Sequence, residues 1–177
     1  MTVRSVLQLG TPSLWEPSAP VTDPRDPVIG TLVEDLHDTL LHWRATTTYG
    51  RGIAAPQIGV PRRLLVLDLG ERWPLVNAQI VRRSPATLVL WDACLSFLDL
   101  FGQVLRHAWI DVRWQDLDGA WHEQRFEGEL SELLQHEIDH LDGILAVARL
   151  LDVRSLCTRE QFERRYRQAS PYARPAS

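Results

Sequence analysis

The sequence predicts a single α+β domain, because several short apolar runs in its middle precede one amphipathic helix. Its 177 residues, of which 45% are hydrophobic, are enough to bury one core. Asp118-Gly119 lies between two runs in which apolar and polar residues alternate, as in an antiparallel hairpin. We expect residues 1–157 to form the domain, and residues 158–177 to add a surface helix and a flexible tail.

The N-terminal part is predicted to form an extended arm followed by a helix. Four prolines within the first 25 residues disfavour a helix there. Asp26 is placed to cap a helix that begins at Pro27, and apolar residues at helical spacing continue it to about residue 43. The next segment contains Gly50-Arg51-Gly52, in which small residues allow close approach of a ligand or another segment.

The rest of the chain is predicted to contain five strands and two helices. A helix is expected over residues 129–141, ended by Gly143. A last helix, opened by Thr158, is basic enough to lie on the surface, and the tail Pro171–Ser177 is expected to be disordered. Apolar or alternating runs predict strands at residues 64–67, 75–76, 86–91, 109–116 and 121–126.

Composition and charge exclude several classes of protein. A net charge of -4 gives no electrostatic footprint for nucleic acid. No apolar run approaches the roughly 18 residues of a membrane span, and the N-terminus lacks the apolar core of a signal peptide. We therefore expect a cytoplasmic protein with neither nucleic acid nor a membrane as partner. Cys94 and Cys157 are too few for a disulfide framework, and the absence of lysine excludes a lysine mechanism.

The helix over residues 129–141 carries a pattern with the spacing of a metal site. His136 and His140 are four residues apart, so they lie one turn apart on the same face and can bind one metal ion. Glu137 can take a proton from water at such a metal and pass it to a leaving group. Two histidines on a helix are often ordinary surface or core residues, so the pattern alone leaves both interpretations open.

A catalytic metal site needs a third protein ligand. The best candidate is Cys94, which follows a predicted strand at a point where its thiolate can reach a helix packed on the sheet. A lone cysteine, however, is more often a small buried apolar residue. Three segments occur in order: Gly-x-Gly followed by Gln57, Cys94-Leu95-Ser96, and the Gln-His-Glu-x-Asp-His-Leu segment from Gln135. Together they resemble the three motifs of peptide deformylases, and the similarity spans roughly residues 3 to 152.

The resemblance implies small antiparallel sheets packed around a central metal-binding helix. It implies one divalent metal ion per chain, held by Cys94, His136 and His140. That ion would be Fe²⁺ in the cell, with Zn²⁺, Ni²⁺ or Co²⁺ as alternatives in the isolated protein. The partner would be an N-formylated peptide or small molecule, and the chain would be a monomer or a homodimer.

The resemblance also implies a reaction. Glu137 would serve as base and then as acid while a formyl group is removed from an amine and formate is released. The side-chain amide of Gln57 and the backbone N–H of Leu95 would stabilise the developing oxyanion.

Some residues depart from the family. Asp92-Ala93 stands where the family has Glu-Gly, which shortens a carboxylate expected to pair with Arg106 and puts a methyl group where substrate backbone runs. Asp139 matches a family position that orients a ligand histidine.

The residues expected to line the substrate pocket also differ from those of the family. Glu129 and Glu132 lie seven and four residues before His136, on the metal-facing side of the helix. The resemblance implies apolar residues there and at Arg51, holding a methionine side chain. A charged lining favours an N-formyl metabolite with a polar or cationic side chain, whereas charges turned outward would leave an ordinary peptide deformylase. The residues expected to line the pocket are Gly50, Arg51, Gly52, Ala93, Glu129, Glu132 and Leu133.

Three functions follow from these patterns. The first is a deformylase-type metallohydrolase, the second a zinc peptidase, and the third a metal-binding or interaction protein without catalysis. Cys94 and Gln57 count against the second, because such peptidases do not need them. The complete set of metal-facing groups counts against the third, and an assay for formate release separates all three.

Overall fold

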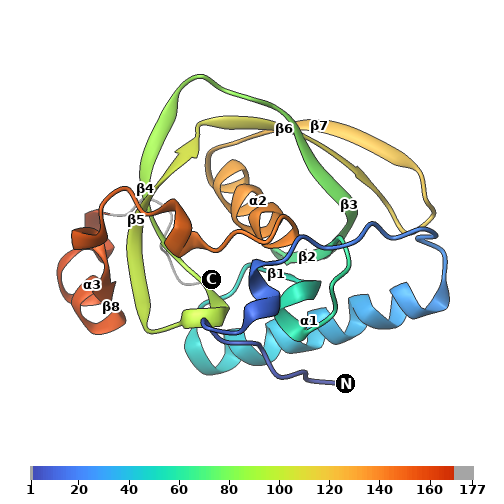
Figure 1. Ribbon diagram of the computed structural model, residues 1–177, viewed down its shortest axis with the longest axis horizontal. Helices are drawn as coiled ribbons and strands as arrows, with labels where there is room; N and C mark the ends of the chain where they lie inside the picture. Colours follow the sequence, from blue (N-terminus) through green and yellow to red (C-terminus); the bar gives the residue numbers. More distant parts are fainter. Residues whose placement is uncertain (1, 170–177) are drawn as a thin grey trace.

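The computed structural model describes residues 2–169 and has the α+β architecture that the sequence predicts. Within those residues the strands form two antiparallel sheets arranged around a central helix (Figure 1). The larger sheet has the order β1-β2-β3-β6-β7 and the smaller sheet the order β4-β5-β8. The helices are α1 (Pro27–Thr47), α2 (Gly128–Leu141) and α3 (Arg159–Arg165). The strands are β1 (Gly52–Ala54), β2 (Leu64–Asp68), β3 (Arg72–Arg83), β4 (Thr87–Ala93), β5 (Leu100–His107), β6 (Trp109–Gln115), β7 (Trp121–Glu127) and β8 (Cys157–Thr158).

The predicted hairpin is present as β6 and β7, in which Gln115 pairs with Trp121. β3 is much longer than the two apolar residues that predicted it, and its register with β6 shifts between Val76 and Gln79 and again after Ile80. Such bulges interrupt the regular alternation that sequence reading depends on. Strands β1, β5 and β8 were not predicted; β1 and β8 have three and two residues, which are too few to show a periodic pattern.

From Ser131 to its end, helix α2 is buried on all sides, unlike a helix that covers a sheet at the protein surface. Every residue from Ser131 to Leu141 is buried. One face of α2, with Leu134 and Ile138, packs into the apolar core under the larger sheet. The other face carries Glu132, His136 and His140, so these polar side chains must find their partners inside the protein.

The N-terminal arm crosses the body and contacts the segments that will form the site. The N–H of Leu7 donates to the carbonyl of Gln57 at 2.8 Å, and the N–H of Leu9 donates to the carbonyl of Ser96 at 2.8 Å. The N–H of Ser18 donates to the last turn of α2, at the carbonyl of Leu141. Gly143 follows with a φ of +70°, and a Cβ there would lie 2.7 Å from the arm backbone. The arm therefore fixes the end of the central helix.

Helix α1 begins as predicted, with the Asp26 side chain accepting from the N–H of Val28 at 2.9 Å. It continues one turn beyond the predicted end and stops at Thr47, before Thr48 in the left-handed conformation. Arg44 explains the extra turn, because its guanidinium donates to the carbonyl of Gly50 at 3.0 Å and to the Asp68 carboxylate on β2 at 3.0 Å. These bonds also hold the loop that leads into β1.

Helix α3 exposes most of its residues, but one of its side chains reaches the interior. Phe162 is fully buried and its ring stacks on Phe101 of β5, with 4.2 Å between centroids. Immediately before α3, Cys157 pairs with Phe101 to add β8 to the smaller sheet. Helix α3 therefore packs against the domain, while the tail Pro171–Ser177 lies outside the described residues.

Among residues 2–169, the helices are all too short or too polar to cross a membrane.

We predict that Phe162→Ala lowers the free energy of unfolding by about 3–5 kcal/mol, because it removes a fully buried ring and leaves a cavity. Urea unfolding followed by fluorescence measures the change. Val153→Ala is the control, since Val153 is 72% exposed and its truncation should change the free energy by less than about 0.5 kcal/mol. A similarly small effect of Phe162→Ala would show that α3 is not docked in solution.

Candidate metal centre and active-site cavity

Three side chains from distant parts of the sequence converge beside α2. Cys94 Sγ lies 3.1 Å from His140 Nε2, and one donor atom from each of Cys94, His136 and His140 lies within 4.8 Å of the others. All three residues are buried. Cys94 directly follows β4 and accepts a hydrogen bond from the N–H of Ser96, so the strand end places its sulfur against the helix. The fold therefore brings together three side chains that could hold a metal ion.

The chemistry of this donor set fits a divalent transition metal. One thiolate with two imidazoles suits Fe²⁺ or Zn²⁺ better than the hard cations, which prefer oxygen ligands. Burial, together with the neighbouring His136, holds the pKa of His140 well below its usual value, so its ring is neutral as a ligand must be. The Oε2 atom of Glu137 is also buried without a hydrogen-bond partner in the described chain. An orphaned carboxylate oxygen of this kind marks a place where a further group belongs.

Asp92 holds the ring of His136. Its Oδ1 atom lies 2.9 Å from His136 Nδ1, and its Oδ2 atom accepts from Arg106 Nη2 at 2.8 Å. Burial raises the pKa of Asp92, but His136 and Arg106 outweigh it and hold that pKa well below the usual value. The contact on Nδ1 fixes the ring and leaves Nε2 as the nitrogen available to a metal.

Asp139 differs from its expected role. Its carboxylate contacts Arg106 of β5 and Arg149 rather than a histidine, with Arg149 Nη2 donating at 2.7 Å. Asp139 precedes His140 directly on α2, so its side chain leaves the helix about 100° away from that histidine and faces the arginines. The carboxylate that contacts a candidate ligand histidine is Asp92.

Glu137 lies between β1 and the metal centre. It is buried, and burial is the main cause that raises its pKa to about 7. A Cβ at position 52 would lie 2.6 Å from Glu137 Oε1, so only glycine allows β1 to pack this close. The charge of a bound metal would lower the pKa again. Glu137 is thus a buried carboxyl group, held beside the candidate metal centre, whose proton affinity depends on what is bound there.

Gln57 presents its amide to the same centre. Its Oε1 atom accepts from the N–H of Ala54 at 2.8 Å, which fixes the orientation of the side chain. Its Nε2 atom then donates to Cys94 Sγ at 3.4 Å and to Ser96 Oγ at 3.3 Å. Leu95 follows Cys94 and faces the same space.

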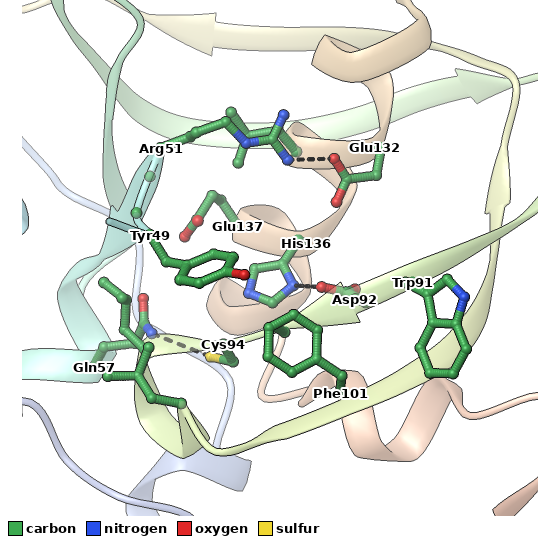
Figure 2. A pocket seen from close by; sticks show the side chains of 16 residues that line it. Tyr49, Arg51, Gln57, Trp91, Asp92, Cys94, Phe101, Glu132, His136 and Glu137 are labelled. Atoms are coloured by element: carbon green, nitrogen blue, oxygen red, sulfur yellow. Dashed lines mark hydrogen bonds and ion pairs between the residues drawn. The ribbon is translucent and has the colours of Figure 1, made fainter. Parts of the chain in front are cut away.

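A cavity opens beside the metal centre, and most residues expected to bind substrate line it (Figure 2). Glu129 does not line it, because its side chain is 58% exposed and lies at the outer end of α2. The expected residues that line the cavity are Gly50, Arg51, Gly52, Ala93, Glu132 and Leu133. The sequence did not predict that Tyr49, Trp91, Leu98 and Phe101 also line it.

Helix α3 supports this aromatic wall from behind. The Tyr49 hydroxyl donates to Glu163 Oε1 at 3.2 Å, and Phe101 stacks on Phe162. Trp91 stacks on Tyr166, with 4.7 Å between ring centroids. These contacts link segments that lie far apart in the sequence, so no local pattern could have indicated them.

Comparison with known proteins agrees with this geometry. The sequence model of the polypeptide deformylase family matches residues 3–155. A peptide deformylase of Rhizobium meliloti is 38% identical over 176 residues, which cover 96% of this chain and 95% of that protein. The crystal structure of peptide deformylase from Thermotoga maritima has a TM-score of 0.79 at 31% identity, over 86% of this chain and 100% of that one. A class I type b peptide deformylase from Acinetobacter baumannii, with Met-Ala-Ser bound, has a TM-score of 0.77 at 30% identity, over 84% and 99% of the two chains.

The family match includes the arm, the larger sheet, α2 and every residue of the candidate metal centre, and it ends before α3. The Rhizobium meliloti relative extends the similarity over nearly the whole chain. On these grounds the chain belongs to the polypeptide deformylase family.

Proposed function

We propose that this protein is a metal-dependent hydrolase that removes the formyl group from an N-formylated peptide or related amine and releases formate. The observation that carries this proposal is the convergence of Cys94, His136 and His140 beside the buried carboxyl group of Glu137, at the edge of a cavity. Membership of the polypeptide deformylase family supports the same reaction. We further propose Fe²⁺ as the metal in the cell, because a thiolate with two imidazoles suits it, although Zn²⁺, Ni²⁺ and Co²⁺ fit the same ligands.

The residues around the cavity have different roles in the proposed hydrolysis. A divalent metal bound by Cys94, His136 and His140 would supply Lewis-acid polarisation and lower the pKa of water. Glu137 accepts the proton of the attacking water and then donates it to the departing amine. The Gln57 amide and the Leu95 backbone N–H donate to the oxygen that becomes negative as water adds to the formyl carbon.

A formate-release assay on anaerobically purified, iron-loaded protein tests the proposed function. Formyl-methionyl peptides and other N-formyl compounds should yield formate and a free amine in equal amounts. Cleavage of internal peptide bonds without formate would instead indicate a zinc peptidase. A fully metal-loaded protein that releases no formate from any N-formyl compound would indicate a binding protein without this activity.

We predict that His140→Ala abolishes stoichiometric metal binding, because a three-ligand site cannot lose an imidazole without a large loss of affinity. Metal analysis after dialysis should fall from one equivalent per chain to well below one. The melting temperature should no longer rise on metal addition, since metal binding free energy adds to folding. His122→Ala is the control, because His122 is a half-exposed histidine that contacts Asp116 on the hairpin. A full metal equivalent in His140→Ala would contradict the ligand assignment.

We predict that Glu137→Gln keeps the metal and lowers kcat by roughly a hundredfold to ten-thousandfold, the range for lost acid–base catalysis. Steady-state formate release and metal analysis on the same sample separate the two effects. Glu34→Gln, at an exposed position on α1, should leave both unchanged. If Glu137→Gln turns over within a few-fold of wild type, another group moves the proton.

A further inference from the structure

One wall of the cavity is charged, and the proposed chemistry does not use it. Arg51 Nη2 lies 2.6 Å from Glu132 Oε2, so the two side chains form a hydrogen-bonded ion pair. Figure 2 shows this pair on one side of His136 and Glu137, with Cys94 and Gln57 on the other. Glu132 precedes His136 by four residues on α2, which places it about 6 Å along the same face.

The pair is largely shielded from solvent, with Glu132 buried and Arg51 half-buried. The Glu132 side chain is 7% exposed and that of Arg51 is 22% exposed. Both residues line the cavity together with Leu133. Burial raises the pKa of Glu132, while Arg51 opposes that rise. A charged pair at this depth remains favourable only while both partners keep their hydrogen bonds.

An apolar substrate side chain is poorly matched to this wall. Filling the cavity with such a group would remove water from the free N–H groups of Arg51 and from the second oxygen of Glu132. Nothing would replace those hydrogen bonds, and unpaired polar groups are costly to bury. A guanidinium has five N–H donors, and the bond to Glu132 accounts for one of them.

A cationic substrate side chain is matched no better. Arg51 already neutralises Glu132, so a second cation would meet the guanidinium at close range. The other carboxylate expected from the sequence, Glu129, is 58% exposed and lies 3.9 Å from Arg51, where water screens its charge. The expectation of a cationic side chain rested on unpaired carboxylates, which the structure does not contain at this wall.

A neutral group with both a donor and an acceptor satisfies both members of the pair. A carboxamide oxygen can accept from Arg51 while its NH₂ donates to Glu132. We propose that the enzyme prefers N-formyl substrates whose first side chain ends in a neutral hydrogen-bonding group, such as a carboxamide, over those with an apolar or cationic side chain. This inference rests on the proposed deformylase function and specifies the substrate class of the same cavity.

The test compares three N-formyl dipeptides that differ in the first side chain: glutamine, methionine and lysine. Glutamine and methionine have similar length, so their comparison isolates polarity. For the wild type we expect kcat/KM for formyl-glutamine to exceed that for formyl-methionine by about tenfold or more, the effect of leaving one or two hydrogen-bonding groups unmatched. Formyl-lysine should be no better than formyl-methionine.

The double variant Arg51→Ile with Glu132→Ile removes both charges together and should reverse the preference toward formyl-methionine. The matched control replaces the Arg72 and Glu34 pair by the same residues. Those side chains are 39% and 58% exposed and join β3 to α1 away from the cavity. The control should keep the wild-type order of substrates and the wild-type ratio between them.

A second readout does not depend on turnover. Calorimetry with the deformylated products should show that the wild type binds the glutamine product more tightly than the methionine product, and that the double variant does not. A wild type that prefers the methionine compounds in both readouts, or the lysine compounds, overturns the inference while the proposed function stands. Absence of formate from every substrate would contradict the proposed function instead, and the product affinities would still decide the preference of the cavity.

Discussion

The rest of the candidate metal centre depends on the ion pairs that the buried guanidinium of Arg106 makes. Its side chain is 2% exposed, and it joins Asp92 at the end of β4 to Asp139 on α2. Asp92 in turn holds the ring of His136. Removing one partner from such a network leaves an uncompensated buried charge, which typically costs 3–5 kcal/mol. One arginine on β5 therefore links the smaller sheet, the central helix and the orientation of a candidate ligand histidine.

Short-range patterns predicted the parts of the structure that short-range physics determines. The i, i+4 spacing places His136 and His140 on one face whatever surrounds the helix, and Asp118-Gly119 specifies a hairpin turn by itself. The contact of Cys94 with this helix is different, because it depends on how β4 and η3 (Leu95–Phe97) meet α2. A lone cysteine does not indicate that contact. The resemblance to peptide deformylases, carried by three motifs in order, did indicate it.

The differences from expectation arise where tertiary packing decides. Asp139 is close in sequence to both histidines, yet arginines on other elements determine what its carboxylate contacts. The aromatic wall of the cavity depends on the contact between Phe162 of α3 and Phe101, which no local pattern indicates. Glu129 and Glu132 look equivalent on a helical wheel, but only Glu132 faces the cavity and reaches Arg51 at 2.6 Å. Whether a helical charge is solvated or paired is decided by the opposite segment, and no helical periodicity contains that information.

The central claim is that a thiolate and two imidazoles from distant segments share one metal ion. X-ray absorption spectroscopy of protein reconstituted with one equivalent of Zn²⁺ tests it most directly, since the spectrum reports the number and type of ligand atoms. We expect one sulfur scatterer at about 2.3 Å and two imidazole nitrogens at about 2.0–2.1 Å, with the remaining position occupied by oxygen. A spectrum with no sulfur, or with fewer than two imidazoles, would contradict the assignment of Cys94, His136 and His140 as the metal centre.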